Sequence, residues 1–192
     1  MSVIDYKSEN HTYTIDGIPA ISVTKVLEMA GLTNFQFAKQ EDIDFGTKVH
    51  YMCELHDRGI LDHKSLHPLL LPYWESYKKF LLDYKPTIMH TELIVGTKAL
   101  MVAGRIDRVM GIAGMIYIAD IKSGAEGSAE IQTAGYKILY NSDKKKPWLA
   151  VSRMAIMLNK EGAYRIESYR DKSDENVFLS ALNIARYKLN RG

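Results

Sequence analysis

The chain contains 192 residues, of which 46% are hydrophobic and 25% are charged, and its formal net charge is +2. These values fit one domain with a buried core, and they exclude disordered, collagen-like and coiled-coil proteins. The single cysteine, Cys53, excludes an internal disulfide framework, a four-cysteine zinc site and a four-cysteine iron–sulfur cluster. Because the apolar runs are short and no secretory signal is evident at the N-terminus, we expect a soluble, cytoplasmic protein without a membrane partner.

Turn signals and hydrophobic periodicity predict the elements in chain order. Asp16 and Gly17 lie between β-type residues and predict an N-terminal hairpin, after which Ser22 or Thr24 can cap a helix. The further predicted elements are helices over 25–30 and 45–58, a helix after Pro72, strands over 91–95, 100–110 and 115–121, a helix over 129–140, strands over 148–157 and 163–169, and a C-terminal helix over 174–189. This order predicts a central mixed β-sheet flanked by helices, an α/β or α+β fold.

Ionisable residues in two apolar strands are the most informative feature of the sequence. Asp107 lies within one predicted strand, and Asp120 and Lys122 end the next one. A turn centred between residues 112 and 113 would place the two aspartates diagonally on one face of the sheet, with backbones roughly 7–8 Å apart. Lys122 follows Asp120 by two residues and therefore points to the same face.

Two converging carboxylates form an all-oxygen site that suits Mg²⁺ or Mn²⁺. A divalent cation there can polarise a phosphoryl oxygen and lower the pKa of a bound water, and Lys122 can orient that water or neutralise charge on a phosphate. The alternative is structural: Asp120 and Lys122 form an ion pair at the strand end, and Asp107 pairs with Arg105 or Arg108.

Four motifs and the N-terminal segment together resemble a known family. The motifs are Gly46 followed by His50, Gly104-x-x-Asp107, Asp120-x-Lys122-Ser123-Gly124 and Gln132-x-x-x-Tyr136, and the N-terminal segment is 18–24. In this order they are similar to the RecB-type branch of the PD-(D/E)xK nuclease superfamily, which includes phage exonucleases. The resemblance covers roughly residues 45–140 and the N-terminal segment, and it implies a restriction-endonuclease-like core. Residues 1–192 would form a single nuclease domain, elaborated by the N-terminal hairpin and helix.

The resemblance also implies a role for each matching residue. The metal ligands would be His50, Asp107, Asp120 and the backbone carbonyl of Ile121, and Glu92 matches a glutamate that many members place near the metals. Lys122 would be the catalytic lysine, and Gln132 and Tyr136, one turn apart on a helix, would brace this lysine and the substrate phosphate. The residues expected to contact DNA are Ser22, Thr24, Arg105, Ser123, Lys144, Lys145 and Lys146, although the three lysines could equally form a solvated turn.

The function implied is that of a Mg²⁺- or Mn²⁺-dependent DNA exonuclease in recombination, repair or phage DNA processing. Its partners would be single- or double-stranded DNA ends and a single-strand annealing or recombination protein, in the cytoplasm of a bacterial or phage-infected cell. Two alternatives remain: a structure- or site-specific endonuclease on the same fold, and a nucleic-acid-binding module with a degenerate site.

Overall fold

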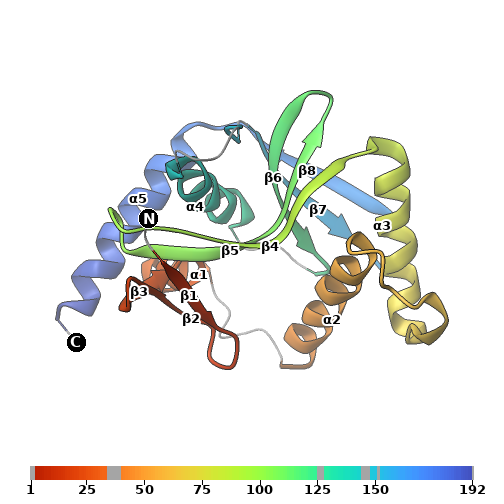
Figure 1. Ribbon diagram of the computed structural model, residues 1–192, viewed down its shortest axis with the longest axis horizontal. Helices are drawn as coiled ribbons and strands as arrows, with labels where there is room; N and C mark the ends of the chain where they lie inside the picture. Colours follow the sequence, from red (N-terminus) through yellow and green to blue (C-terminus); the bar gives the residue numbers. More distant parts are fainter. Residues whose placement is uncertain (1–2, 34–39, 125–127, 144–147, 151, 192) are drawn as a thin grey trace.

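The computed structural model describes residues 3–33, 40–124, 128–143, 148–150 and 152–191 (Figure 1). The strands are β1 (Ile4–Lys7), β2 (Thr12–Ile15), β3 (Ile18–Ser22), β4 (Thr87–Thr97), β5 (Val102–Ile112), β6 (Met115–Lys122), β7 (Ser152–Leu158) and β8 (Tyr164–Tyr169). The helices are α1 (Val23–Ala30), α2 (Gln40–Asp57), α3 (Leu71–Tyr84), α4 (Ala129–Ser142) and α5 (Ser173–Leu189), with short 3₁₀ helices at His63–Ser65 and Pro68–Leu70.

The strands form one mixed sheet. Their order is β1-β2-β3-β5-β6-β7-β8, and β4 pairs with β5 outside this path. The pairs β3–β5 and β6–β7 are parallel, and the other neighbours are antiparallel. The predicted fold class, a central mixed sheet flanked by helices, is therefore confirmed.

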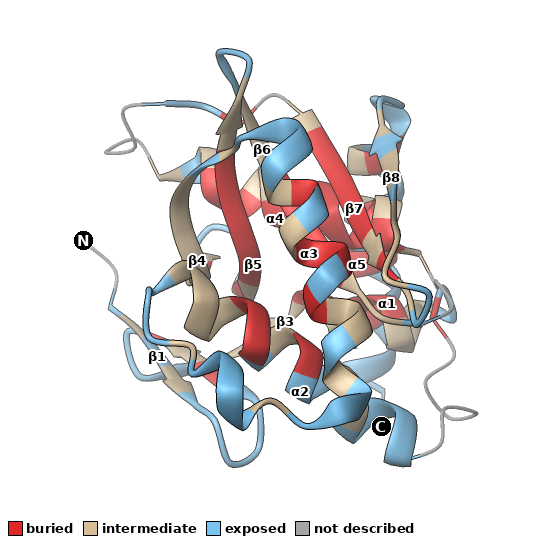
Figure 2. Ribbon diagram, turned by 90° about the vertical axis from the view of Figure 1, so that its right-hand side faces the viewer, coloured by how far each residue is buried: buried red, intermediate tan, exposed pale blue. Residues whose placement is uncertain are grey.

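Two hydrophobic layers cover the sheet. Helices α1, α4 and α5 pack on one side through residues such as Val26, Leu139 and Phe178. Helices α2 and α3 pack on the other side through residues such as Cys53 and Tyr77. In Figure 2, buried residues of β5 and β7 lie behind α3, whose outer turns are exposed. The strands that carry the ionisable residues, β5 and β6, are therefore interior strands of the sheet, buried over most of β5 and over residues 118–121 of β6.

Several element boundaries differ from the predicted ones for local reasons. Strand β1 precedes the predicted hairpin and pairs with β2, so the N-terminal unit has three strands. Helix α2 begins at Gln40 instead of residue 45. Glu41 and Asp42 in its first turn stabilise this start, because their negative charges interact favourably with the positive end of the helix dipole. Strand β7 begins at Ser152, because Trp148 and Leu149 lie exposed ahead of the sheet.

The turn between β5 and β6 corrects the predicted register. Ile112 pairs with Met115, so the turn residues are Ala113 and Gly114, which both adopt positive φ (48° and 78°). The two strands are therefore displaced by two residues from the predicted register. Because side chains alternate with a period of two, a shift of two residues keeps every side chain on its predicted face.

None of the helices in the described ranges combines the length and apolar character needed to cross a bilayer.

Candidate metal centre

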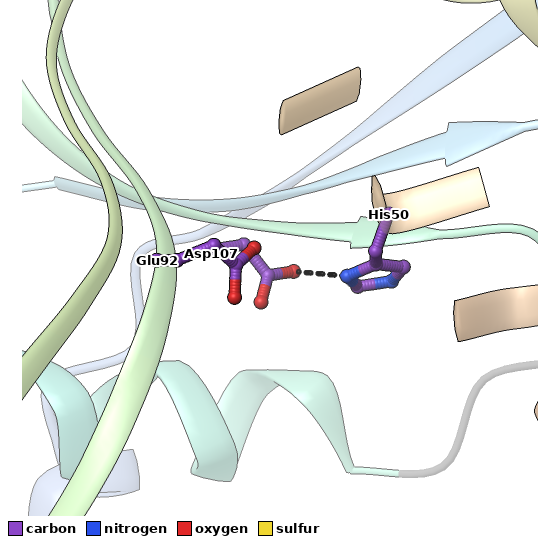
Figure 3. A group of neighbouring side chains, drawn as sticks. All are labelled: His50, Glu92 and Asp107. Carbon is purple, nitrogen blue, oxygen red and sulfur yellow. Dashed lines mark ion pairs between the residues drawn. The ribbon is translucent and has the colours of Figure 1, made fainter. Parts of the chain in front are cut away.

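Three potential metal ligands converge from three different elements. His50 lies on α2, Glu92 on β4 and Asp107 on β5, and one ligand atom from each lies within 4.8 Å of the others. Figure 3 shows the two carboxylates projecting from neighbouring strands toward the imidazole, with the Asp107–His50 ion pair dashed. We refer to His50, Glu92 and Asp107 as the ligand cluster.

Asp107 is held in the ligand cluster by contacts with β6 and α2. Its Oδ2 atom accepts a 2.8 Å hydrogen bond from the backbone N–H of Ile121 and lies 3.3 Å from Nδ1 of His50. The bond to Ile121 connects β5 to β6 just beyond the last paired positions, Arg108 and Ala119. The carboxylate therefore has a fixed direction, as a metal ligand requires.

Asp120 and Lys122 form a second group beside the ligand cluster. Nζ of Lys122 lies 2.7 Å from Oδ2 of Asp120 and donates a 3.3 Å hydrogen bond to Oε1 of Gln132. Nε2 of Gln132 in turn donates to the hydroxyl of Tyr136 over 3.1 Å. The structure thus brings together all four residues, and Asp120 and Lys122 form the ion pair considered above as the structural alternative.

Glu92 reaches the ligand cluster through an unusual backbone conformation. Its φ is 48°, a left-handed value that is rare for a residue inside a strand, and the β4–β5 register shifts between Ile88 and His90. Its two carboxylate oxygens pair with Arg105 (2.9 Å) and Arg108 (3.3 Å). Such strain is typically retained at functional positions, where the surrounding contacts hold it.

The electrostatic environment shifts the pKa values of the acidic residues in opposite directions. Burial alone would raise the pKa of Asp107, but the charge and hydrogen bond of His50 and the Ile121 N–H hold this pKa well below its usual range. Burial and, to a smaller extent, the neighbouring Asp107 charge raise the pKa of Glu92 to about 7, against the opposing effect of Arg105 and Arg108. Burial likewise raises the pKa of Asp120, although Lys122 opposes the increase. The pKa of His50 is raised because Asp107 outweighs the effect of burial.

Gly104 explains how α4 approaches this part of the sheet. A Cβ atom on Gly104 would lie 2.7 Å from Cε1 of Tyr136 and 3.2 Å from Cγ2 of Val23. The absent side chain therefore makes room for the Tyr136 ring. This contact gives a packing reason for the glycine that precedes Asp107 by three positions.

The residues predicted to contact DNA lie in different parts of the structure. Ser22 accepts the N–H of Lys25 as the N-cap of α1 and is hydrogen-bonded to Thr24, so both hydroxyls have local partners. Arg105 lies over the ring of Tyr6, 5.4 Å from its centroid, and its side chain is 40% exposed. Ser123 follows the end of β6, where a Cβ on Gly46 would lie 3.5 Å from its Oγ atom. Lys144, Lys145 and Lys146 lie outside the described residues.

Sequence reasoning missed a buried network next to the ligand cluster. Arg108, considered only as a partner of Asp107, instead binds the carboxylate of Asp57 at the end of α2. Both oxygens of Asp57 also accept the hydroxyl of Tyr77 from α3 at 2.9 Å. A basic residue in the middle of a long strand was the available signal, but the carboxylates that it contacts are 51 and 16 residues away in the chain.

The donor set of the ligand cluster fits a divalent cation. Two carboxylates and one imidazole provide oxygen and nitrogen ligands, and the separations of their ligand atoms are within the span of one coordination sphere. Carboxylates suit Mg²⁺ and Mn²⁺, and imidazole is a common ligand of transition metals. Asp120 approaches the same region from β6 but is engaged with Lys122.

Comparison with known proteins shows similarity at the level of the fold. No protein-family model matches the chain, and no curated protein is similar to it in sequence. A candidate exonuclease from Eubacterium rectale has a similar structure, with a TM-score of 0.54 and 13% sequence identity, over 90% of this chain and 79% of that chain. The structure of LHK-Exo in complex with dAMP matches 90% of this chain and 88% of that chain at 10% identity, with a TM-score of 0.42. The first of these matches shows that the fold occurs in a protein described as a nuclease.

Proposed function

We propose that this chain is a divalent-metal-dependent DNA exonuclease of the RecB-type PD-(D/E)xK branch, with residues 1–192 forming one nuclease domain. The observation that carries the proposal is the convergence of buried carboxylates on adjacent strands with a lysine and a helical histidine. The fold shared with the Eubacterium rectale protein supports a nuclease. DNA ends would be the substrate, in the cytoplasm of a bacterial or phage-infected cell.

The described side chains suggest how the work would be divided. His50, Glu92 and Asp107 would hold the metal, joined by Asp120 and the Ile121 carbonyl. When bound, a divalent cation lowers the pKa of a coordinated water and offsets charge that develops on the scissile phosphate.

Lys122 would act beside the metal. Its ammonium group contacts Asp120 on β6 and Gln132 on α4, and Gln132 donates to Tyr136, so the sheet and α4 together set its position. A positive charge fixed there would stabilise the negative charge that builds on the phosphate during cleavage.

The test is digestion of end-labelled linear DNA with Mg²⁺ or Mn²⁺. We expect wild-type protein to shorten linear DNA progressively, EDTA to stop the reaction, and Asp120→Asn to lower the rate by at least about a hundredfold, because a bound metal would lose one of its acidic ligands. Asp174→Asn is the matched control, since Asp174, like Asp120, is buried and paired with a basic side chain, here Arg153, but lies on α5. Retention of full activity by Asp120→Asn would contradict the site assignment.

Closed circular DNA separates the alternatives. An exonuclease leaves it intact, whereas cleavage of the circle would establish an endonuclease. Binding of DNA without cleavage in either metal would favour the degenerate binding module. A recombination or single-strand annealing protein as a partner is a further proposal that co-purification with such a protein would test.

A further inference from the structure

Arg108 occupies an unusual position for a charged residue. Its side chain is completely buried between the sheet and the layer formed by α2 and α3. The guanidinium donates through Nε to Asp57, and through Nη1 to Oε1 of Glu92 (3.3 Å) and to the backbone carbonyl of Asp107 (2.6 Å). A buried guanidinium is costly to desolvate, so its retention requires a good set of acceptors.

These acceptors belong to the three elements that supply the ligand cluster. Glu92 is itself a member of the cluster, and the Asp107 carbonyl belongs to the residue whose carboxylate is a member. Asp57 is the last residue of α2 and lies seven residues, about two turns, after His50 on the same helix face. One guanidinium therefore connects Glu92 on β4 and the backbone of Asp107 on β5 to the end of α2, the helix that carries His50.

We infer that Arg108 is a positioning residue that sets the separations of His50, Glu92 and Asp107 and so determines the affinity of the site for a divalent cation. This inference rests on the proposed metal centre. Arg108 does not belong to the ligand cluster; it acts through the residues that do.

The chemistry of the side chain supports this role. A guanidinium is planar and presents its N–H groups in fixed directions, so it can hold several acceptors in one geometry, whereas a lysine ammonium is a compact point charge on a flexible stem. Asp57 is in turn fixed by the hydroxyl of Tyr77. Replacement of a group that hydrogen-bonds to metal ligands and orients them typically lowers metal affinity by about 10–100-fold.

The experiment measures Mn²⁺ binding by the loss of the free-ion electron paramagnetic resonance signal, with thermal unfolding followed in parallel. Arg108→Lys keeps the positive charge but loses the planar set of N–H donors that holds the three acceptors. We expect this change to weaken Mn²⁺ binding by about 10–100-fold. Its DNA cleavage should recover toward the wild-type rate at saturating Mn²⁺. Arg153→Lys is the matched control: Arg153 is also buried, pairs with Asp174 and donates to two backbone carbonyls, but none of these contacts reaches the ligand cluster.

A second variant covers the case in which Arg108→Lys does not fold. Asp57→Asn leaves Arg108 paired with Glu92 but weakens the connection to α2, and it should also reduce Mn²⁺ affinity. Wild-type Mn²⁺ affinity in the folded variants, or equal losses in Arg108→Lys and Arg153→Lys, would overturn the inference. A wild-type protein that binds no Mn²⁺ would overturn it together with the proposed metal centre.

The two proposals can fail separately. If Arg108→Lys weakens Mn²⁺ binding in a protein that cleaves no DNA, the positioning role stands and the exonuclease proposal falls. If the wild type cleaves DNA and Arg108→Lys binds Mn²⁺ normally, the exonuclease proposal stands and the positioning role falls.

Discussion

Replacing Gly104 with alanine tests the packing of α4 against the sheet. The new Cβ would lie 2.7 Å from Cε1 and 3.3 Å from Cδ1 of Tyr136, and 3.2 Å from Cγ2 of Val23. The Tyr136 ring is buried and hydrogen-bonded to Gln132, so it cannot move away without disturbing that bond. Overpacking of this kind costs about 1–3 kcal/mol.

A smaller contribution to the free energy of unfolding of Gly104→Ala is stabilising. Alanine restricts the unfolded chain more than glycine does and recovers about 0.4–1 kcal/mol where the native backbone allows it. We therefore expect Gly104→Ala to lower the free energy of unfolding by about 1–2 kcal/mol. For a protein of this size, the loss corresponds to a decrease in Tm of roughly 2–8 °C.

The assay is thermal unfolding in EDTA, so that metal binding does not contribute, with Gly111→Ala as the control on the same strand. A Cβ on Gly111 would meet its nearest atoms at 3.8 and 4.0 Å, which is ordinary contact. We expect this control to melt at or slightly above the wild-type temperature. Gly104→Ala melting together with Gly111→Ala would refute the reasoning.

Two further predictions concern charge at the site. Because metal ligands must be deprotonated, and the pKa of Glu92 is raised to about 7 and that of His50 is also raised, Mn²⁺ affinity should increase as the pH rises through about 7. Glu92→Gln should remove one proton from this dependence, leaving the contribution of His50; an unchanged slope in a titration series would contradict the assignment. Arg105→Ala should weaken DNA binding and reduce the slope of log Kd against log salt by about one. Lys172→Ala should change neither as much, because Lys172 lies near Met115 and Tyr117 at the start of β6, away from Lys122 at its end.

Much of the fold could be predicted because it depends on local patterns. The Asp16–Gly17 hairpin, the Ser22 cap and the order of helices and strands follow from turn residues and from the periods of two and 3.6, which neighbouring residues define. The prediction that Asp107 and Asp120 share a face holds although the predicted register was wrong by two residues, because side chains alternate along a strand with a period of two. Strand β1 was missed because four residues carry little periodic signal.

The composition, the alternating strands and the spaced motifs determine by themselves a mixed α/β fold and a list of candidate acidic residues. Only the tertiary structure decides the geometry in which they meet: it brings ligand atoms of His50, Glu92 and Asp107 within 4.8 Å of one another, and it joins α2 to the sheet through Arg108 and Asp57. These contacts connect segments as far as 57 residues apart, such as His50 and Asp107. Their geometry depends on how whole helices pack on the sheet and on the left-handed backbone of Glu92, and no local pattern encodes either.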